Sequence, residues 1–437
     1  MSPGPSASGP SGPAGRSILL ISYFFPPTRD TGAQRPAAMA KYLARLGHRV
    51  TVLTTKAFGD GEPGDGDGLD GVEVIRADDL QAVRARRAGH ERIDSLFDSD
   101  TYSGKPHPLS YAIHPEPLRL AWGPFARRAA LAAHRRAGFE AVISTSPPET
   151  AHLIGRALHR RGVPWVADVR DAWTFEPLRP EFPLSAQRKL DARMERRVLG
   201  AADRVVCVSE PAAADLRDRG IAREDSVAVI ANAWDPDEEP TADAVSAAAD
   251  LLDPERTSIV YTGRFGSYGR DPAPLVDAIG RLNTTQSGKA AALELAIAGP
   301  LREDEAALFA TVAGGPLKLS LLGSLERDRS RALQRSADAL LLLAQPTRSQ
   351  LVNFKLFEYL AAARPILALC AGTEAGRILS EAGSPVVAAD DPDAIAASLA
   401  AAAELTPPDP ALAQRYSYPA AAAAMAAVVE DAVSAHR

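Results

Sequence analysis

Short apolar runs alternate along the chain with longer segments in which apolar residues recur every three or four positions. The runs are continuous, as strands covered on both faces must be, whereas the segments between them have the period of helices packed on one face. This alternation is typical of parallel sheets with crossover helices. The runs predict strands that begin at Ser17, His48, Val72, Ala141, Pro164, Arg204, Val227, Ser258, Leu293, Leu317, Ala337, Pro365 and Ser384.

The strands fall into two series, which are separated by an acidic segment with several prolines between Ala233 and Arg256. A chain of 437 residues exceeds the size at which a single hydrophobic core stops growing. The predicted fold is therefore α/β, with two doubly wound, Rossmann-like parallel-sheet domains facing a central cleft. The expected boundaries are a disordered tail at 1–16, a first domain at 17–233, a linker at 234–257, a second domain at 258–412 and a C-terminal helix at 413–437.

The composition is that of an ordinary soluble globular protein, with 46% hydrophobic and 24% charged residues. The net charge of -6 argues against a dedicated nucleic-acid binder, which normally has a basic excess. Cys207 and Cys370 lie in apolar runs, which favours buried core thiols over a disulfide and fits a reducing cytoplasm. No apolar window is long enough for a transmembrane helix, and the N-terminus lacks the apolar core of a signal peptide. We therefore expect a cytoplasmic protein, with peripheral contact to a membrane left open.

Two segments do not follow the alternation. Residues 83–115 combine basic, polar and aromatic residues without a clear period, so they form either a mobile insertion over the cleft or a solvated loop. Residues 64–71 are rich in glycine and aspartate, which predicts a surface turn.

The loops after strands of the first series carry one candidate site, because ligands bind beyond the carboxyl ends of parallel strands. Gly32, after the first strand, would let the backbone approach a ligand closely, and the following helix offers its N-terminus to an anion. Asp168, Arg170 and Asp171 cluster after another strand. This cluster predicts either a functional site or a structural ion pair between arginine and aspartate. His152 is a candidate base, although a lone histidine is more often a core or surface residue.

The loop YTGRFGSYGR opens the second series. Arg264 directly follows a strand and Arg270 lies one loop later, an arrangement that suits a clamp for a diphosphate. The glycines of the loop permit a close approach of the backbone to a ligand. A glycine-rich turn with solvated arginines is the alternative explanation of the same residues.

The segment LVNFKLFEYLAAARPIL is largely apolar, yet it contains Asn353, Lys355 and Glu358. Asn353 is a good N-cap, and the helix that it predicts ends before Arg364. Helical spacing places Lys355, Glu358 and Ala362 on one face. The other face, expected to pack on the sheet, consists of Leu356, Phe357, Leu360 and Ala361. The helix N-terminus would bind a phosphate and Glu358 a vicinal diol, whereas the alternative is an exposed Lys–Glu pair.

These motifs together resemble one family, the GT4-type glycosyltransferases of the GT-B fold. The resemblance covers nearly the whole chain after the tail, and it rests on SYFFPPTRDTGAQRPAAMAKYLARLGHRVTVLT, VADVRDAW, ADRVVCVSE, VIANAWD, YTGRF and KLFEYLAAARPIL in that order. It implies a retaining enzyme that uses a nucleotide-sugar donor without a metal ion. It also implies an acceptor-binding domain at 17–233, a donor-binding domain at 258–412 and a C-terminal helix that packs back toward the first domain.

The resemblance also implies roles for individual residues. Expected donor-binding residues are Gly32, Gly263, Arg264, Arg270, Gln350, Asn353, Phe354, Lys355 and Glu358. Expected acceptor-binding residues are Arg170, Asp171 and Trp173, and the expected catalytic residues are Asp171, Arg264 and Arg270. Glu358 matches the second glutamate of the family's Glu-x7-Glu motif, which grips the nucleotide ribose. The first glutamate is replaced by Gln350, which can bond a sugar hydroxyl but offers no carboxylate.

The implied activity is hexosyl or N-acetylhexosaminyl transfer from a nucleoside diphosphate sugar to a small-molecule, glycan or lipid-linked acceptor. No metal cofactor and no nucleic-acid partner are expected. Two alternatives remain: a non-hydrolysing nucleotide-sugar epimerase, and a protein that binds a nucleotide sugar without catalysis. The sequence does not identify the sugar, the nucleotide base or the acceptor.

Overall fold

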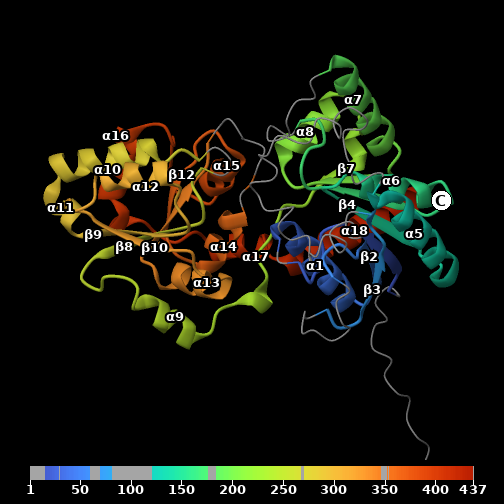
Figure 1. The fold of residues 1–437 in the computed structure, drawn as a ribbon, viewed down its shortest axis with the longest axis horizontal. Coiled ribbons are helices and arrows are strands. Elements are labelled where there is room, and N and C mark those ends of the chain that lie inside the picture. The colour runs from blue at the N-terminus through green and yellow to red at the C-terminus, as the bar shows by residue number, and fades with distance from the viewer. Residues whose placement is uncertain are drawn as a thin grey trace, which may run out of the picture. The chain divides into compact units, whose positions relative to one another are not determined.

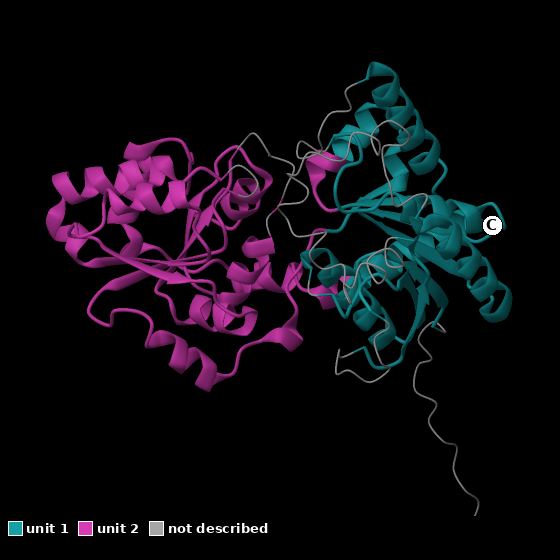
Figure 2. Ribbon diagram, in the orientation of Figure 1, with its two compact units in different colours: residues 1–207, 213–230, 422–437 teal, residues 208–212, 231–421 magenta. Residues whose placement is uncertain are grey.

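The computed structural model describes residues 15–28, 30–59, 69–80, 121–175, 184–266, 270–345, 352 and 354–436. The chain forms two compact units (Figure 2). Unit 1 comprises residues 1–207, 213–230 and 422–437, and unit 2 comprises residues 208–212 and 231–421. Each unit is built around one parallel sheet (Figure 1), which confirms the predicted α/β class.

Unit 1 contains a seven-stranded sheet in the order β3-β2-β1-β4-β5-β6-β7. Its strands are β1 (Ser17–Ile21), β2 (Arg49–Thr55), β3 (Val72–Ala77), β4 (Ala141–Ser146), β5 (Trp165–Val169), β6 (Arg204–Cys207) and β7 (Val227–Val229). Its helices are α1 (Thr31–Arg45), α5 (Gly123–Ala137), α6 (Thr150–His159), α7 (Ser185–Leu199), η2 (Glu224–Ser226) and, in part, α8 (Glu210–Asp218) from Ala213 on and α18 (Tyr418–His436) from Ala422 on.

Unit 2 contains a six-stranded sheet in the order β10-β9-β8-β11-β12-β13. Its strands are β8 (Thr257–Thr262), β9 (Leu293–Ala298), β10 (Lys318–Gly323), β11 (Ala339–Leu343), β12 (Ile366–Leu369) and β13 (Val386–Val387). Its helices are η3 (Pro236–Glu238), α9 (Ala242–Ala249), α10 (Ala273–Thr285), α11 (Ser287–Ala291), α12 (Glu303–Ala310), α13 (Arg327–Ser336), α14 (Phe354–Ala362), α15 (Glu374–Glu381), α16 (Pro392–Ala400), η6 (Ala402–Glu404) and α17 (Pro410–Arg415).

The continuous apolar runs arise because the central strands are covered on both faces. In β8, Ile259 and Tyr261 pack into the core on one side of the sheet, whereas Val260 packs into the core on the other side. Figure 1 shows α10, α12 and α16 on one face of this sheet and α13 and α14 on the other. The edge strands β3 and β10 are less buried and correspondingly contain polar residues.

The strand order of each sheet reverses beside its first strand. In unit 1, β1 lies between β2 and β4, and in unit 2, β8 lies between β9 and β11. Ligands of doubly wound sheets bind beyond the carboxyl ends of the strands at such a switch point. Gly32 lies in the first turn of α1, the helix that follows β1, and Gly263 begins the loop after β8.

Several predicted boundaries differ from the structure. The predicted linker 234–257 is not simply extended chain, because it contains η3 and α9, and Thr241 caps α9 by accepting a hydrogen bond from Ala244 N at 3.2 Å. Arg16, assigned to the disordered tail 1–16, forms ion pairs with Glu140 and Glu430. The predicted C-terminal helix 413–437 is interrupted, because α17 ends at Arg415 and α18 begins at Tyr418.

The two cysteines are free and buried, as predicted. Among the described residues, no helix is both long and apolar enough to cross a membrane. The segment 83–115 and most of the glycine-rich turn at 64–71 lie outside the described residues.

Candidate functional site

Helix α14 carries the polar residues of the segment LVNFKLFEYLAAARPIL, and it follows β11 in unit 2. Leu356, Phe357 and Leu360 are buried in the core on that side of the sheet, which fixes the helix in place. Ala362 is buried and Ala361 is half-buried, the reverse of the prediction for these two alanines. Tyr359, one position after Glu358, is also fully buried.

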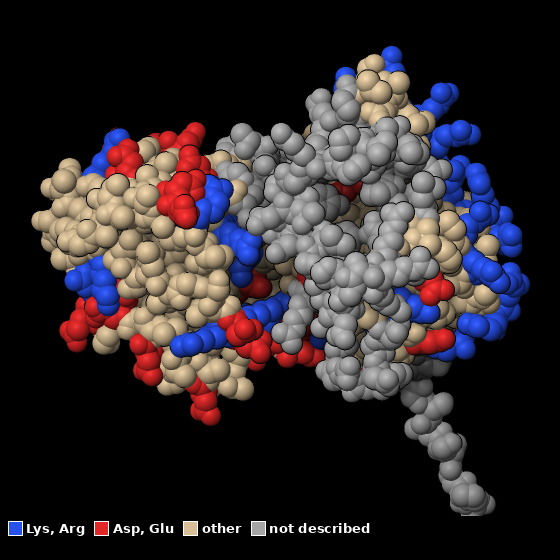
Figure 3. Space-filling view, in the orientation of Figure 1, with Lys and Arg blue, Asp and Glu red and all other residues tan. Residues whose placement is uncertain are grey.

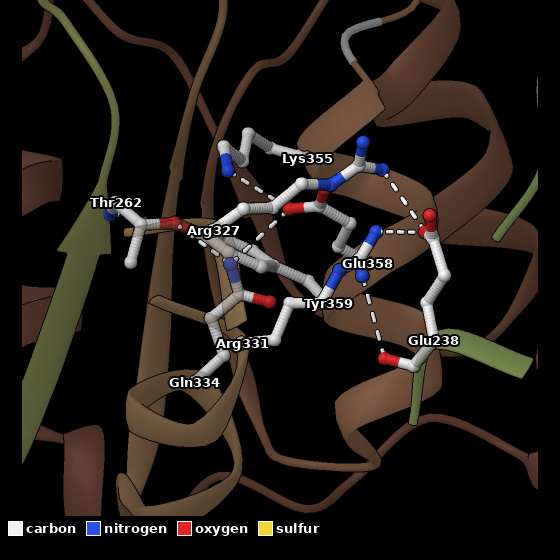
Figure 4. Close-up of polar contacts among 8 residues, drawn as sticks. All are labelled: Glu238, Thr262, Arg327, Arg331, Gln334, Lys355, Glu358 and Tyr359. Atoms are coloured by element: carbon white, nitrogen blue, oxygen red, sulfur yellow. Dashed lines mark hydrogen bonds and ion pairs between the residues drawn. The ribbon is translucent and has the colours of Figure 1, made fainter. Parts of the chain in front are cut away.

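The carboxylate of Glu358 lies at the centre of a hydrogen-bonded cluster (Figure 4). Its Oε2 atom accepts hydrogen bonds from Lys355 Nζ at 2.8 Å and from Gln334 Nε2 at 3.2 Å. Only 13% of the Glu358 side chain is exposed, so the pair with Lys355 is not the exposed pair of the alternative reading. Among the described residues, no donor reaches the other carboxylate oxygen, Oε1, which keeps its capacity to accept hydrogen bonds from a ligand.

The surroundings of Glu358 favour its ionised form. Burial alone would raise the pKa of this carboxyl, but the charges of Lys355 and Arg331 and the hydrogen bonds from Lys355 and Gln334 hold the pKa below its ordinary value. Glu358 is therefore an acceptor at neutral pH. Arg331 is in turn tied to Glu238, which also accepts a hydrogen bond from Arg327 at 3.1 Å (Figure 4).

Gln334 of α13 is a residue that the sequence analysis missed. Its Nε2 atom also donates to Thr262 Oγ1 at 3.0 Å, and the backbone N–H of Thr262 donates to the Tyr359 hydroxyl at 3.0 Å. The end of β8 is thereby joined to α13 and α14 around the carboxylate of Glu358. The sequence could have indicated Gln334, because it is a polar residue directly after Ala332 and Leu333, which are buried.

The loop after β8 begins with a glycine and lies beside Lys355 of α14. Gly263 has a φ of 131°, which a residue with a side chain rarely adopts. The Lys355 Cε atom lies 3.9 Å from the position that a Cβ of Gly263 would occupy. A Cβ on Gly299, after β9, would lie 1.9 Å from the Gly263 carbonyl oxygen. Gly263 is thus required by its backbone conformation, and Gly299 by the close packing of the two loops.

Arg264 and Arg270 lie on the same loop of unit 2. Arg264 is exposed, and its carbonyl oxygen accepts hydrogen bonds from the Tyr261 hydroxyl at 2.9 Å and from Arg270 Nε at 3.1 Å. The structure therefore brings together Gly263, Lys355 and Glu358, with the two arginines on the adjacent loop. Phe354 is the first residue of α14 and is half-buried, whereas Gln350 and Asn353 lie outside the described residues.

In unit 1, Gly32 is the second residue of α1 and has a local structural reason to be glycine. Its N–H donates to the side chain of the N-cap residue Asp30 at 2.6 Å. A Cβ at Gly32 would lie 2.9 Å from Asp30 Oδ1 and 3.3 Å from the ring of Phe24. Close packing inside the loop thus accounts for this glycine without a ligand.

Arg170 is buried and holds three backbone segments together. Its guanidinium donates to the carbonyl oxygens of Ser146 at 2.6 Å and Pro147 at 3.3 Å, and also to that of Gly32. These contacts tie the loop after β4 to the start of α1. Arg170 therefore has a structural role, whereas the sequence predicted only that it contacts the acceptor.

Asp168 forms a structural ion pair with an arginine, which was one of the two alternatives predicted for this cluster. Its partner, however, is the fully buried Arg35 of α1, with 2.8 Å between Arg35 Nη2 and Asp168 Oδ1. Thr145 Oγ1 donates to Asp168 Oδ2 at 2.8 Å. Burial would raise the pKa of Asp168, but Arg35, Thr145 and Arg170 hold it below its ordinary value. Arg35 escaped prediction because an arginine in an amphipathic helix normally faces solvent.

Asp171 is the one predicted acceptor residue of the three that is exposed. Surrounding protein raises the pKa of its carboxyl by desolvation, against the charge of Arg170. Trp173 is instead only 3% exposed, and its Nε1 donates to Asp191 at 2.9 Å, which places it in the core of unit 1. Trp173 can support this region but offers almost no surface to an acceptor.

His152 is fully buried, and burial lowers its pKa to about 4, so the imidazole is neutral at pH 7. Its Nδ1 atom lies 2.8 Å from Ser144 Oγ, which also accepts a hydrogen bond from Trp165 Nε1 at 2.8 Å. The ring lies alongside Trp173, with 6.4 Å between centroids. These contacts correspond to a core histidine, the more common of the two predicted roles.

Family models match both units. Residues 31–233 match the family described as a glycosyl transferase 4-like domain, and residues 256–404 match the glycosyl transferases group 1. The chain belongs to the GT4-type glycosyltransferases of the GT-B fold. A search of the curated proteins gave no match.

Solved structures share the fold of this glycosyltransferase at low sequence identity. Sucrose-phosphate synthase from Thermosynechococcus elongatus is 17% identical, with a TM-score of 0.58 and coverage of 95% of this chain and 98% of that one. Anabaena HepE in complex with UDP-glucose is 14% identical, with a TM-score of 0.59 and coverage of 95% and 99%. A UDP-forming α,α-trehalose-phosphate synthase from Burkholderia xenovorans, in complex with glucose-6-phosphate, is 12% identical, with a TM-score of 0.60 and coverage of 95% and 100%.

One group of side chains in the described part of the glycosyltransferase could reach a metal ion: His159, Asp203 and His436 of unit 1. The Asp203 carboxylate already pairs with both histidines, at 3.2 Å from His159 Nδ1 and 3.1 Å from His436 Nδ1. It also accepts a hydrogen bond from Trp165 N at 2.7 Å. These contacts fasten the end of α18 to α6 and β5, and they account for the three side chains without a metal.

Proposed function

We propose that this glycosyltransferase moves a sugar from a nucleoside diphosphate sugar to an acceptor, with retention of the anomeric configuration. The observation that carries this proposal is the carboxylate of Glu358, which is ionised, largely buried and open at Oε1 at the switch point of the unit 2 sheet. A carboxylate held in this way is suited to accept hydrogen bonds from the two hydroxyls of a ribose.

The donor diphosphate would lie against the positive charges around Glu358. Lys355 lies beside the backbone of Gly263, and Arg264 and Arg270 occupy the loop that Gly263 begins. In this proposal the glycine gives the phosphates access to the backbone, and the three basic residues stabilise them. Gln350, Asn353 and Phe354 complete the donor site as the family resemblance implies.

The chemistry requires stabilisation of the departing nucleoside diphosphate, on which negative charge builds up. Fixed positive charges of the protein can supply this stabilisation, so we propose that the reaction needs no metal ion. Activity should persist after treatment with EDTA. A complete loss of activity that Mg²⁺ or Mn²⁺ restores would contradict this part of the proposal.

For the acceptor we propose the surface of unit 1 around Asp171, the exposed carboxylate after β5. The structural neighbours include an enzyme bound to UDP-glucose and another bound to glucose-6-phosphate. They support hexosyl transfer to a small-molecule acceptor as the first case to test. A glycan or lipid-linked acceptor and N-acetylhexosaminyl transfer are the next cases.

The proposal is tested by incubating the protein with a panel of UDP-, GDP- and ADP-sugars and with sugar and sugar-phosphate acceptors. We expect release of one nucleoside diphosphate, which increases when an acceptor is present, and a product whose anomeric configuration in an NMR spectrum matches that of the donor. The Glu358→Gln variant is the matched control, because it should release far less. A donor converted to its epimer would indicate an epimerase instead, and binding without any release would indicate a non-catalytic protein.

A further inference from the structure

Gln334 is a buried polar residue of α13, and neighbouring side chains use both hydrogens of its amide (Figure 4). Its Nε2 atom donates to Thr262 Oγ1 at 3.0 Å and to Glu358 Oε2 at 3.2 Å. An ionised carboxylate only accepts hydrogen bonds, so the nitrogen of the amide, and not its oxygen, must face Glu358. The side chain of Gln334 is therefore fixed in one orientation.

The other partner of the amide, Thr262, is fixed in turn by the hydroxyl of Tyr359. The backbone N–H of Thr262 can only donate, and it donates to this hydroxyl at 3.0 Å. The hydroxyl hydrogen of Tyr359 is then directed to Thr262 Oγ1, which lies 3.2 Å away. Thr262 Oγ1 thus accepts from both Tyr359 and Gln334, so the direction of each hydrogen bond in this group is set.

Helix α13 is held on both of its sides, so the position of the amide does not depend on Glu358. On the inner side, Leu333 is buried in the core of unit 2. On the outer side, Arg327 and Arg331 both pair with Glu238 of η3. Figure 3 shows Lys and Arg beside Asp and Glu on the surface of unit 2 near α13. The helix therefore presents the amide of Gln334 from a fixed support.

Lys355, which also donates to Glu358 Oε2, is held less firmly. Its side chain is 28% exposed and lies on the same helix as Glu358, three positions earlier. Its ammonium group carries three hydrogens and lies in the region that we propose for the diphosphate, so it can turn toward the phosphates. Gln334 has no such freedom, because it is buried and both of its hydrogens are used. The amide is therefore the fixed contact of Oε2.

We propose that Gln334 is a positioning residue of the donor site, which holds the carboxylate of Glu358 so that Oε1 faces the ribose hydroxyls. This inference rests on the proposed role of Glu358 in donor binding. A neutral amide suits this role better than a charged group does. A basic side chain would pair with the carboxylate and compete with the ribose, whereas an acidic one would repel the carboxylate. The amide orients the carboxylate and leaves its charge available to the hydroxyls.

The test compares two ligands that differ only in the ribose. Calorimetric titration gives the affinity for UDP, GDP or ADP, whichever binds most tightly, and for the 2′,3′-dideoxy form of the same nucleoside diphosphate. The ratio of the two affinities measures the contribution of the ribose hydroxyls. In the unaltered protein this ratio should be at least about ten, because each hydrogen bond to a charged group contributes roughly tenfold or more.

Gln334→Met removes both hydrogen-bond donors and keeps an unbranched side chain of similar length. The ratio should fall about fivefold, because the carboxylate loses its fixed orientation, whereas the affinity for the dideoxy ligand should stay within about twofold of the original. Leu333→Met is the matched control, because it changes the packing of the same helix one position away and should leave the ratio unchanged. A structural role of Gln334 alone would weaken both ligands equally and preserve the ratio, which would overturn the inference.

Glu358→Gln separates this inference from the function on which it rests. If this variant keeps the ratio of the unaltered protein, Glu358 does not bind the ribose, and both the proposed donor site and the role of Gln334 are wrong. If Glu358→Gln lowers the ratio and Gln334→Met does not, only the role of Gln334 is wrong. The double variant should have the ratio of Glu358→Gln alone, because Gln334 acts through the carboxylate, and a further decrease would contradict this role.

A second substitution keeps the test decisive if Gln334→Met fails to fold. Thr262→Val retains the shape of the side chain but removes the oxygen that accepts from Gln334. The amide is then no longer fixed at both of its hydrogens, so the ratio should fall about threefold while the affinity for the dideoxy ligand stays within about twofold. An unchanged ratio in this variant would overturn the inference.

Discussion

Asp168 of unit 1 and Glu358 of unit 2 are both carboxylates beside a basic side chain, and the pKa of each is held below its ordinary value. Their surroundings differ. Asp168 uses both oxygens on Arg35, with Thr145 as a further donor, and 5% of its side chain is exposed. Glu358 uses one oxygen on Lys355 and Gln334, and 13% of its side chain is exposed.

The difference shows that a lowered pKa does not by itself distinguish a structural carboxylate from a binding one. Both groups are charged because a cation and hydrogen bonds outweigh burial. The two carboxylates differ in their remaining capacity to accept hydrogen bonds: both oxygens of Asp168 accept from protein, whereas Glu358 Oε1 has no donor among the described residues. Mutations of the two residues should therefore affect different properties, folding in one case and binding in the other.

The largest expected effect is on stability, from Asp168→Asn. The substitution leaves the fully buried Arg35 without its charged partner, and loss of one member of a buried ion pair costs about 3–5 kcal/mol. We expect the free energy of unfolding, measured by urea titration of intrinsic fluorescence, to fall by that amount. Asp171→Asn is the control, because replacing this exposed residue should change the free energy of unfolding by less than about 0.5 kcal/mol. Similar values for both variants would remove the structural role assigned to Asp168.

The second effect is on binding, from Glu358→Gln. Charge-assisted hydrogen bonds contribute roughly 1.5–3 kcal/mol each, so nucleoside diphosphate affinity should fall at least about tenfold. The free energy of unfolding without ligand should change by about 1 kcal/mol or less, since the amide can still accept from Lys355. Calorimetric titration and thermal unfolding measure the two quantities. Unchanged affinity with reduced stability would show that Glu358, like Asp168, has a structural role, and would contradict the proposal that α14 binds the donor.

A smaller effect is expected from Asp171→Asn on transfer. If this exposed carboxylate contacts the acceptor, its loss should lower the transfer rate by about fivefold, which corresponds to roughly 1 kcal/mol. Nucleoside diphosphate affinity should stay within twofold of the original, because the residues that we propose for the donor lie in unit 2. Initial rates at saturating donor, set beside titrations of the diphosphate, give the comparison. An equal loss of rate and affinity would assign Asp171 to the donor site.

The smallest effect concerns Asp203, a partly exposed carboxylate between the two extremes. The Asp203 carboxylate lies 3.2 Å from His159 Nδ1 and raises the pKa of His159, against burial. The pair therefore stabilises the fold in full below the ordinary histidine pKa, and less as the pH rises through the raised value. His159→Gln should thus lower the free energy of unfolding by about 0.5–1 kcal/mol at pH 6 and by less at pH 9. Unfolding curves of both proteins at the two pH values test this prediction. An equal effect at both pH values, or a larger one at pH 9, would contradict it.

The sequence predicted the sheets well because strands covered on both faces are almost uniformly apolar. It placed Lys355 and Glu358 on a common helix face, since α14 has a clear apolar stripe. It missed α9, whose alanines lie between acidic and proline-rich stretches that read as a linker.

The partners of the charged residues could not be predicted from the sequence for a different reason. The pairing of Asp168 with Arg35 joins residues 133 positions apart, and the bridge from Gln334 to Glu358 spans 24 positions. Local periodicity carries no information about such contacts. Arg170 and Trp173 are sequence neighbours of Asp171, but their burial could not be predicted, because it depends on the packing of α1, α6 and α7 around them.

The close approach of Gly263 and Gly299 has a practical consequence for directed evolution of this enzyme. A library that randomises the loops after β8 and β9 would lose most of its members at these two positions, because a Cβ on Gly299 meets backbone and Gly263 has a φ that side chains rarely adopt. Arg264 is exposed, but it is also unsuited to such a library, because we propose that its side chain stabilises the donor diphosphate. A library that is meant to keep the enzyme folded and active should therefore leave Gly263, Arg264 and Gly299 unchanged.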